Sequence, residues 1–118
     1  MPRLDFPKVH TPINLSDYLP AFGAQVVSVW VNPPVATLRH IIDVLQAETP
    51  DNAAIFAGLA DLWDGWTAQE IGELFEQSSS REPDLWNWLI ESTFAAINDY
   101  RDERKKAFRV RLPSSQTE

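Results

Sequence analysis

Hydrophobic positions follow two different patterns along this chain of 118 residues. Residues 25–31 hold four valines and Trp30 in a dense run of β-branched and aromatic side chains, which predicts a strand. The run is nearly continuous rather than alternating, so we expect cover on both of its faces. Two strand partners remain open. One is the Ile13–Leu15 region, and the other is Phe108–Leu112, where apolar residues alternate with arginines.

After this strand, apolar residues recur at three- and four-residue intervals, which predicts helices. The first helix is expected to begin at Pro33–Pro34, with Asn32 as its cap, because proline is tolerated in a first turn. A second helix is predicted over Asp51–Trp63. An Asp-Gly pair further on is also a hairpin signal, so residues 55–66 remain open between helix and hairpin.

A third helix has the strongest local start signal in the sequence. Thr67-Ala68-Gln69-Glu70 is a capping box, flanked by Trp66 and Ile71 as a hydrophobic staple. The pattern predicts a helix from Ala68 to about Gln77, and we expect Ser78–Ser80 to break it.

The last and longest helix is predicted to open at Pro83. Most apolar residues from Leu85 to Tyr100 share one face at 100° per residue. Trp88 and Phe94 are exceptions, because they project from the polar side. We expect the other four tryptophans in core positions, whereas Trp88 either packs beneath the N-terminal arm or anchors an interface.

These patterns predict a mainly α fold with a small β element, in which three to four helices pack on a short N-terminal strand or hairpin. Residues 1–12 carry three prolines and are expected to form an extended arm. Residues 13–107 then form a single α-rich domain with one modest core, and residues 108–118 a basic, then polar, C-terminal tail.

Charge is unevenly distributed in a chain whose net charge is −7. The stretch from Asp43 to Asp84 is strongly acidic, whereas Arg101–Arg111 holds most of the basic residues. An acidic body argues against a nucleic-acid partner, because phosphate contacts require clustered cations. Cations in the last turns of a helix also offset its macrodipole.

No catalytic, cofactor-binding or metal-binding residues are predicted. The chain has no cysteine, and His10 and His40 stand far apart without a metal-ligand spacing. A phosphate-binding glycine loop and a nucleophile elbow are both missing from the sequence. We therefore expect no enzyme and no small-molecule substrate. With neither a signal peptide nor a membrane span in the sequence, a cytosolic protein is expected.

The order of these parts resembles the tail assembly chaperones of long-tailed (siphovirus-type) bacteriophages. The resemblance is carried by Val26–Pro34, by Leu62-Trp63-Asp64-Gly65-Trp66-Thr67 running into Glu70, Ile71 and Leu74, and by Pro83–Ile97. One departure is the short connection at Asp64-Gly65, where the family often has a longer loop.

The resemblance implies a protein of the host cytoplasm that binds the tape-measure protein and keeps it soluble during tail tube assembly, with the tail tube protein as a further candidate partner. We also expect self-association without the client. Alternatives are a structural tail or head–tail connector subunit, or a small acidic host-directed inhibitor. The predicted partner-binding residues are the two polar-side aromatics and the basic stretch: Trp88, Phe94, Arg101, Arg104, Lys105, Lys106, Arg109 and Arg111.

Overall fold

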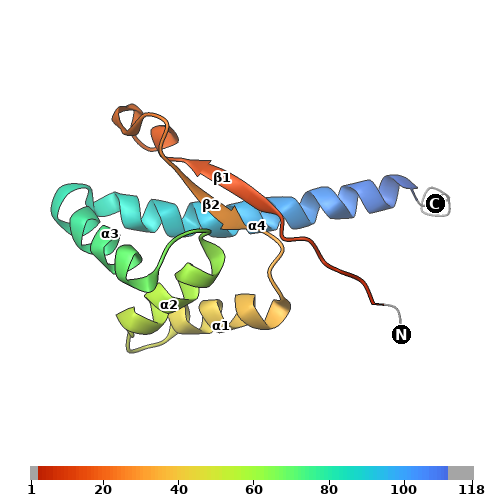
Figure 1. The fold of residues 1–118 in the computed structure, drawn as a ribbon, viewed down its shortest axis with the longest axis horizontal. Helices are drawn as coiled ribbons and strands as arrows, with labels where there is room; N and C mark the ends of the chain where they lie inside the picture. Colours follow the sequence, from red (N-terminus) through yellow and green to blue (C-terminus); the bar gives the residue numbers. More distant parts are fainter. Residues whose placement is uncertain (1–2, 112–118) are drawn as a thin grey trace.

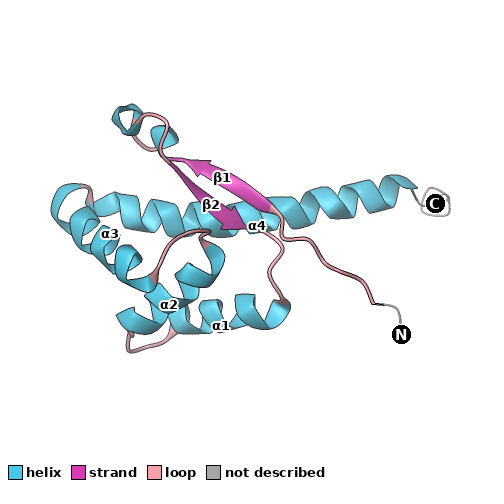
Figure 2. Ribbon diagram, in the orientation of Figure 1, coloured by secondary structure: helices cyan, strands magenta, loops and turns pink. Residues whose placement is uncertain are grey.

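Four α-helices and a two-stranded antiparallel sheet make up residues 3–111, the part of the chain that the computed structural model describes (Figure 2). This confirms the predicted mainly α fold with a small β element. The elements are β1 (His10–Asn14), the 3₁₀ turns η1 (Leu15–Asp17) and η2 (Pro20–Phe22), β2 (Val26–Trp30), α1 (Val35–Gln46), α2 (Asn52–Leu62), α3 (Ala68–Arg81) and α4 (Pro83–Arg111).

The sheet lies across the long helix α4, and the other three helices complete the body (Figure 1). α1 packs on α2, α2 on α3, and α3 on α4, while both strands contact α4. The core lies between the inner face of the sheet and the helices, and its fully buried members include Val27, Val29, Leu59, Leu62, Ile71, Leu89 and Ile97.

The partner of β2 is β1, with Ile13 opposite Val27 in antiparallel register. Of the two open partners, the N-terminal one is therefore confirmed. The alternative partner, Phe108–Leu112, was wrong, because Phe108–Arg111 continue α4. Leu112 lies outside the described residues. The expected cover on both faces is only partial, since Val27 and Val29 are buried on one face, whereas on the other Val26 is exposed and Trp30 is half-buried.

Asn32 holds the N-terminal arm instead of capping a helix. Its Oδ1 accepts a hydrogen bond from the Val9 N–H at 2.8 Å, and its Nδ2 donates to the Pro7 carbonyl at 2.8 Å. The expected cap was wrong because this amide is already used by the arm, and α1 begins at Val35 with no side-chain cap. The arm is also shorter than expected, since residues 10–12 belong to β1.

Residues 55–66 resolve as the end of a helix followed by a turn. Asp51 caps α2 by accepting from the Ala54 N–H, and the helix ends at Leu62. Trp63 then forms an isolated bridge with Val29, and Gly65 turns the chain with a φ of 82°. The hairpin alternative was wrong because this segment pairs with β2 rather than with itself.

The capping box of α3 is confirmed, with Thr67 and Glu70 bonded reciprocally. The predicted break at Ser78–Ser80 was wrong, since α3 continues to Arg81. Ser79 and Ser80 each donate to the carbonyl four residues earlier at 2.9 Å, which keeps their hydroxyls satisfied within the helix. Ser78 is different, because it is buried at the junction with α4.

An aromatic cluster fills the space between α2, α3 and α4. Trp63 is fully buried and its ring centroid lies 5.8 Å from that of Trp66 and 6.3 Å from that of Trp86. Phe75 continues the cluster at 5.0 Å from Trp86. Trp30 departs from the expected core position, since it is only half-buried and lies on the opposite face of the sheet from Val29.

Candidate functional site

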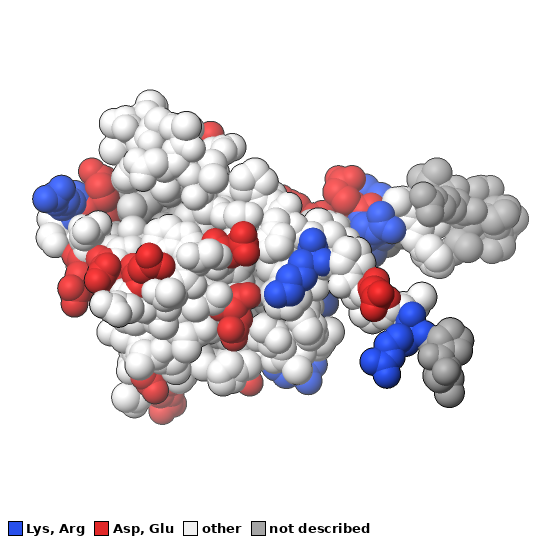
Figure 3. Space-filling view, in the orientation of Figure 1, with Lys and Arg blue, Asp and Glu red and all other residues white. Residues whose placement is uncertain are grey.

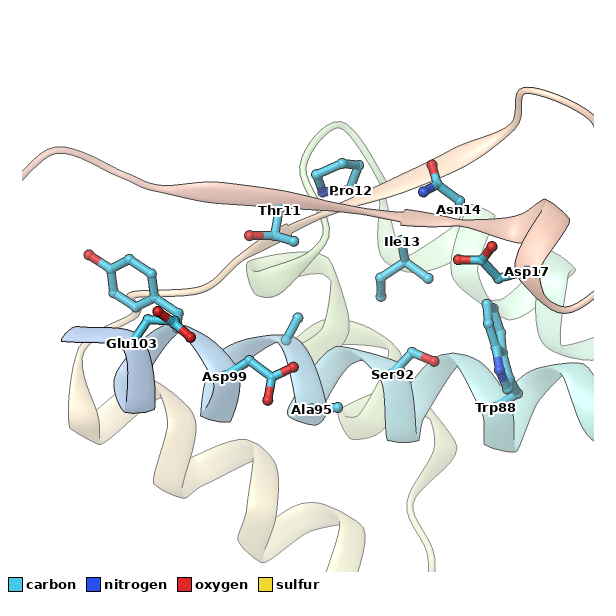
Figure 4. A pocket seen from close by; sticks show the side chains of 12 residues that line it. Thr11, Pro12, Ile13, Asn14, Asp17, Trp88, Ser92, Ala95, Asp99 and Glu103 are labelled. Carbon is cyan, nitrogen blue, oxygen red and sulfur yellow. The ribbon is translucent and has the colours of Figure 1, made fainter. Parts of the chain in front are cut away.

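A groove of about 480 Å³ runs between β1 and α4 (Figure 4). Thr11 and Ile13 point from the strand toward the helix, Trp88 rises from the helix toward the strand, and Asp99 lies alongside the helix. Pro12 lies on the far side of the strand. This geometry brings together two segments that are far apart in the sequence, and it leaves a hollow on the surface between them.

The helical wall of the groove follows from residue spacing. Trp88, Ser92, Ala95, Asp99 and Glu103 recur at three- and four-residue intervals, so they form one stripe along α4. The stripe is about 22 Å long at 1.5 Å per residue. Its middle consists of small side chains, so a bound segment would approach the backbone of α4 closely.

Trp88 forms one end of the groove and packs against Tyr18. The two ring centroids lie 5.4 Å apart. The Tyr18 hydroxyl donates to Glu82 Oε1 at 3.2 Å, which ties the η1 turn to the start of α4. Burial raises the pKa of Tyr18, and the hydrogen bond and charge of Glu82 and the charge of Asp84 raise it further. The hydroxyl therefore stays protonated at neutral pH and keeps donating.

Carboxylates form the rim of the groove. Asp17, Asp99 and Glu103 are all exposed and line it from three positions, and none of the described residues that line it is basic. Glu103 Oε2 lies 3.9 Å from Lys106 Nζ, which is the one ion pair found within residues 3–111. The groove is thus an apolar channel with a negative edge.

The outer edge of β1 borders the groove and is interrupted by Pro12. Ser28, the residue opposite Pro12, directs its carbonyl away from β1 and accepts from the Asp64 N–H at 2.9 Å. By the alternation of an antiparallel pair, Pro12 then faces the free edge, where it offers no N–H. Proline at such a position hinders the addition of another strand.

The structure divides the predicted binding residues into separate regions. Trp88 lines the groove, whereas Phe94 lies about 120° away around α4 and does not line it; both are half-buried and pack against the core. The basic stretch begins about 20 Å beyond Trp88 along the helix axis. Arg101, Arg104, Lys105 and Lys106 are exposed there, while the side chains of Arg109 and Arg111 lie outside the described part of the chain.

The surface charge follows the same division. On the face shown in Figure 3, carboxylates spread over the body, and most cations gather toward the end of the molecule that holds both termini. A partner that touches Trp88 therefore meets acidic groups before it reaches the basic end of α4.

The sequence prediction missed the acidic rim of the groove, which is Asp17, Asp99 and Glu103, and it missed Tyr18, which packs against Trp88 at the end of the groove. At 100° per residue Asp99 falls on the polar face of its helix, where an acidic residue is ordinarily a solvated one. Only the pairing of β1 with β2 brings Asp17 and Tyr18 beside α4, and that pairing was left open. The regular three- and four-residue spacing from Trp88 to Glu103 could have indicated that these residues share one stripe of the helix.

Residues 3–111 show neither a metal-binding cluster nor a membrane-spanning helix. No cluster of three or more His, Cys, Asp or Glu side chains there is arranged to hold a metal ion. Within the same range, no helix combines the length and apolar character of a membrane span. No model of a known protein family matches the chain, and neither a similar curated protein nor a similar solved structure was found. Function is therefore inferred from the residues and their geometry.

Proposed function

We propose that this chain is a tail assembly chaperone of a long-tailed bacteriophage. In this role it binds the tape-measure protein in the host cytoplasm and keeps that long helical chain soluble while tube subunits assemble around it. The tail tube protein is a second candidate partner. The chain performs no catalysis in this proposal, and it needs no cofactor.

The observation that carries the proposal is the groove between β1 and α4. It offers a half-buried Trp88 and apolar side chains on an otherwise acidic surface. Tryptophan and tyrosine are enriched among the residues that contribute most to binding once an interface has buried them. Charge repulsion between acidic bodies also discourages aggregation, which favours solubility of a complex with an apolar client.

The resemblance of the sequence adds the identity of the client. Its first two segments correspond to β2 with the following prolines and to the end of α2 with the capping box. Its third covers α4 as far as Ile97, which includes the Trp88 end of the groove. The segments that resemble the family thus include one wall of the candidate site.

Co-expression of the chain with a tape-measure fragment, followed by pull-down, tests the proposal. We expect Trp88→Ala to weaken capture at least about tenfold, because truncating an anchor aromatic typically costs about 2 kcal/mol or more of binding. Phe6→Ala is a matched control, since Phe6 is 82% exposed and lies outside the groove. A melting curve for each variant separates lost binding from lost folding.

Each outcome has a distinct meaning. Equal capture of the fragment by wild type and Trp88→Ala would mean that Trp88 does not contribute to the interface. A collapsed melting temperature for that variant would show that Trp88 acts mainly in packing. If this chain itself remains in the finished tail, it is a structural tail or connector subunit instead of a chaperone.

A further inference from the structure

From the groove between β1 and α4 we infer the chemistry of the segment that binds there: a short amphipathic helix whose apolar stripe is flanked by lysine or arginine. This inference rests on the proposed function only for the identity of the client. The conformation, charge and length of the bound segment follow from the groove itself.

The bound conformation follows from Pro12. A strand added to β1 would need donors and acceptors along the free edge, but Pro12 removes the central N–H and places its ring there. A helix satisfies its own backbone hydrogen bonds and needs nothing from that edge. The occupant is therefore helical, held by side chains and not by main-chain pairing.

The length and the apolar face follow from α4. The groove stripe extends from Trp88 to Glu103, about 22 Å, which a helix of about 15 residues matches. Ser92 and Ala95 in the middle of the stripe leave room for larger apolar side chains from the partner. Trp88 supplies the aromatic contact at one end.

The charge follows from the rim. Asp17, Asp99 and Glu103 surround the apolar channel, and no basic residue within residues 3–111 lines the groove. Glu103 already attracts the Lys106 ammonium of its own helix. Bases that flank the partner's apolar stripe are complementary to this rim, whereas acidic residues there would be repelled.

The test uses the whole chain and three labelled synthetic peptides of about 15 residues that share one leucine and alanine stripe. The first carries lysine flanks, the second glutamate flanks, and the third lysine flanks with a central proline that breaks the helix. Fluorescence anisotropy measures the Kd of each. We expect the first peptide alone to bind tightly, with affinity that falls as salt rises to about 0.5 M.

Charge reversal then locates the site. In the Asp17→Lys/Asp99→Lys variant, affinity for the lysine peptide should fall roughly tenfold or more, and affinity for the glutamate peptide should rise. The control Asp43→Lys/Asp61→Lys has the same net charge but changes exposed residues of α1 and α2 outside the groove. Its affinity for the lysine peptide should change much less.

Three results would overturn the inference. They are equal affinity for the lysine and glutamate peptides, equal affinity for the proline-broken peptide, or equal loss in the control variant.

Failure of the proposed function looks different. If the lysine peptide binds at the groove but no tape-measure fragment is captured, the groove chemistry stands and the client is wrong. If the fragment is captured equally by the Asp17→Lys/Asp99→Lys variant, the function stands and the groove chemistry is wrong.

Discussion

At the scale of single residues, the core depends on one buried hydroxyl. Thr93 is fully buried on the face of α4 that meets Trp63, the residue that follows α2. Its Oγ1 accepts from Trp63 Nε1 at 3.0 Å and donates to the Leu89 carbonyl at 2.7 Å. A buried indole N–H needs an acceptor, and Thr93 provides it without interrupting the apolar packing.

Replacing Thr93 by valine keeps the shape of the side chain and removes this acceptor. We expect Thr93→Val to lower the free energy of unfolding by about 1–3 kcal/mol, because the Trp63 N–H is left buried without a partner. Denaturant unfolding measures the change. Thr93→Ser is the control, since it keeps the hydroxyl and loses one methyl group, worth about 0.8 kcal/mol. A valine variant as stable as wild type would mean that the hydrogen bond contributes little.

At the scale of elements, the sequence predicted helix starts that depend on neighbouring residues alone. The capping box at Thr67 and the proline at Pro83 each mark a helix start, and the structure begins α3 and α4 there. The prediction of Asn32 as a helix cap failed because its side chain bonds to the N-terminal arm, more than twenty residues away in the sequence. No local pattern contains that contact.

The groove was only half predictable for the same reason. Trp88 stood out because it broke the apolar pattern of its helix. Its neighbour Tyr18 lies 70 residues earlier in the sequence and reaches it only through the hairpin. Hydrophobic periodicity assigns a residue to a face of its own element, but it does not identify the element opposite.

The junction between α3 and α4 yields an element-scale prediction. Ser78 Oγ donates to the Glu82 carbonyl at 2.6 Å and accepts from the Trp86 N–H at 3.1 Å, so one hydroxyl joins the end of α3 to the start of α4. We expect Ser78→Ala to lower the free energy of unfolding by about 1–3 kcal/mol, since both backbone groups lose a partner.

Ser79→Ala is the matched control for that junction, one residue further along. The Ser79 hydroxyl is exposed and bonds only within its own helix, so its loss should change stability by less than about 0.5 kcal/mol. Thermal or denaturant unfolding of both variants gives the comparison. Equal losses would assign the effect to helix propensity instead of the link between the helices.

At the scale of the whole molecule, α4 makes the protein elongated. Its 29 residues span about 43 Å, and its C-terminal end extends past the body (Figure 1). The radius of gyration is 17.0 Å, against about 13.5 Å expected for a compact domain of this length. Phe108 is 62% exposed on this end. Self-association without the client remains a prediction, and this apolar side chain is one surface available for it.

Amide hydrogen exchange should divide α4 into two parts. From Leu89 to Ile97 the helix is packed against the core, and its amides should exchange slowly. At Arg104–Lys106 the side chains are exposed. A helical turn without tertiary packing is marginally stable in water, so exchange there should be much faster. Uniformly slow exchange would mean that this end is covered. If dilution of the protein then makes exchange there faster, the cover is self-association.

If protection of the end rises only when the client is added, the basic stretch is a second contact with the client, separate from the groove and about 20 Å from Trp88.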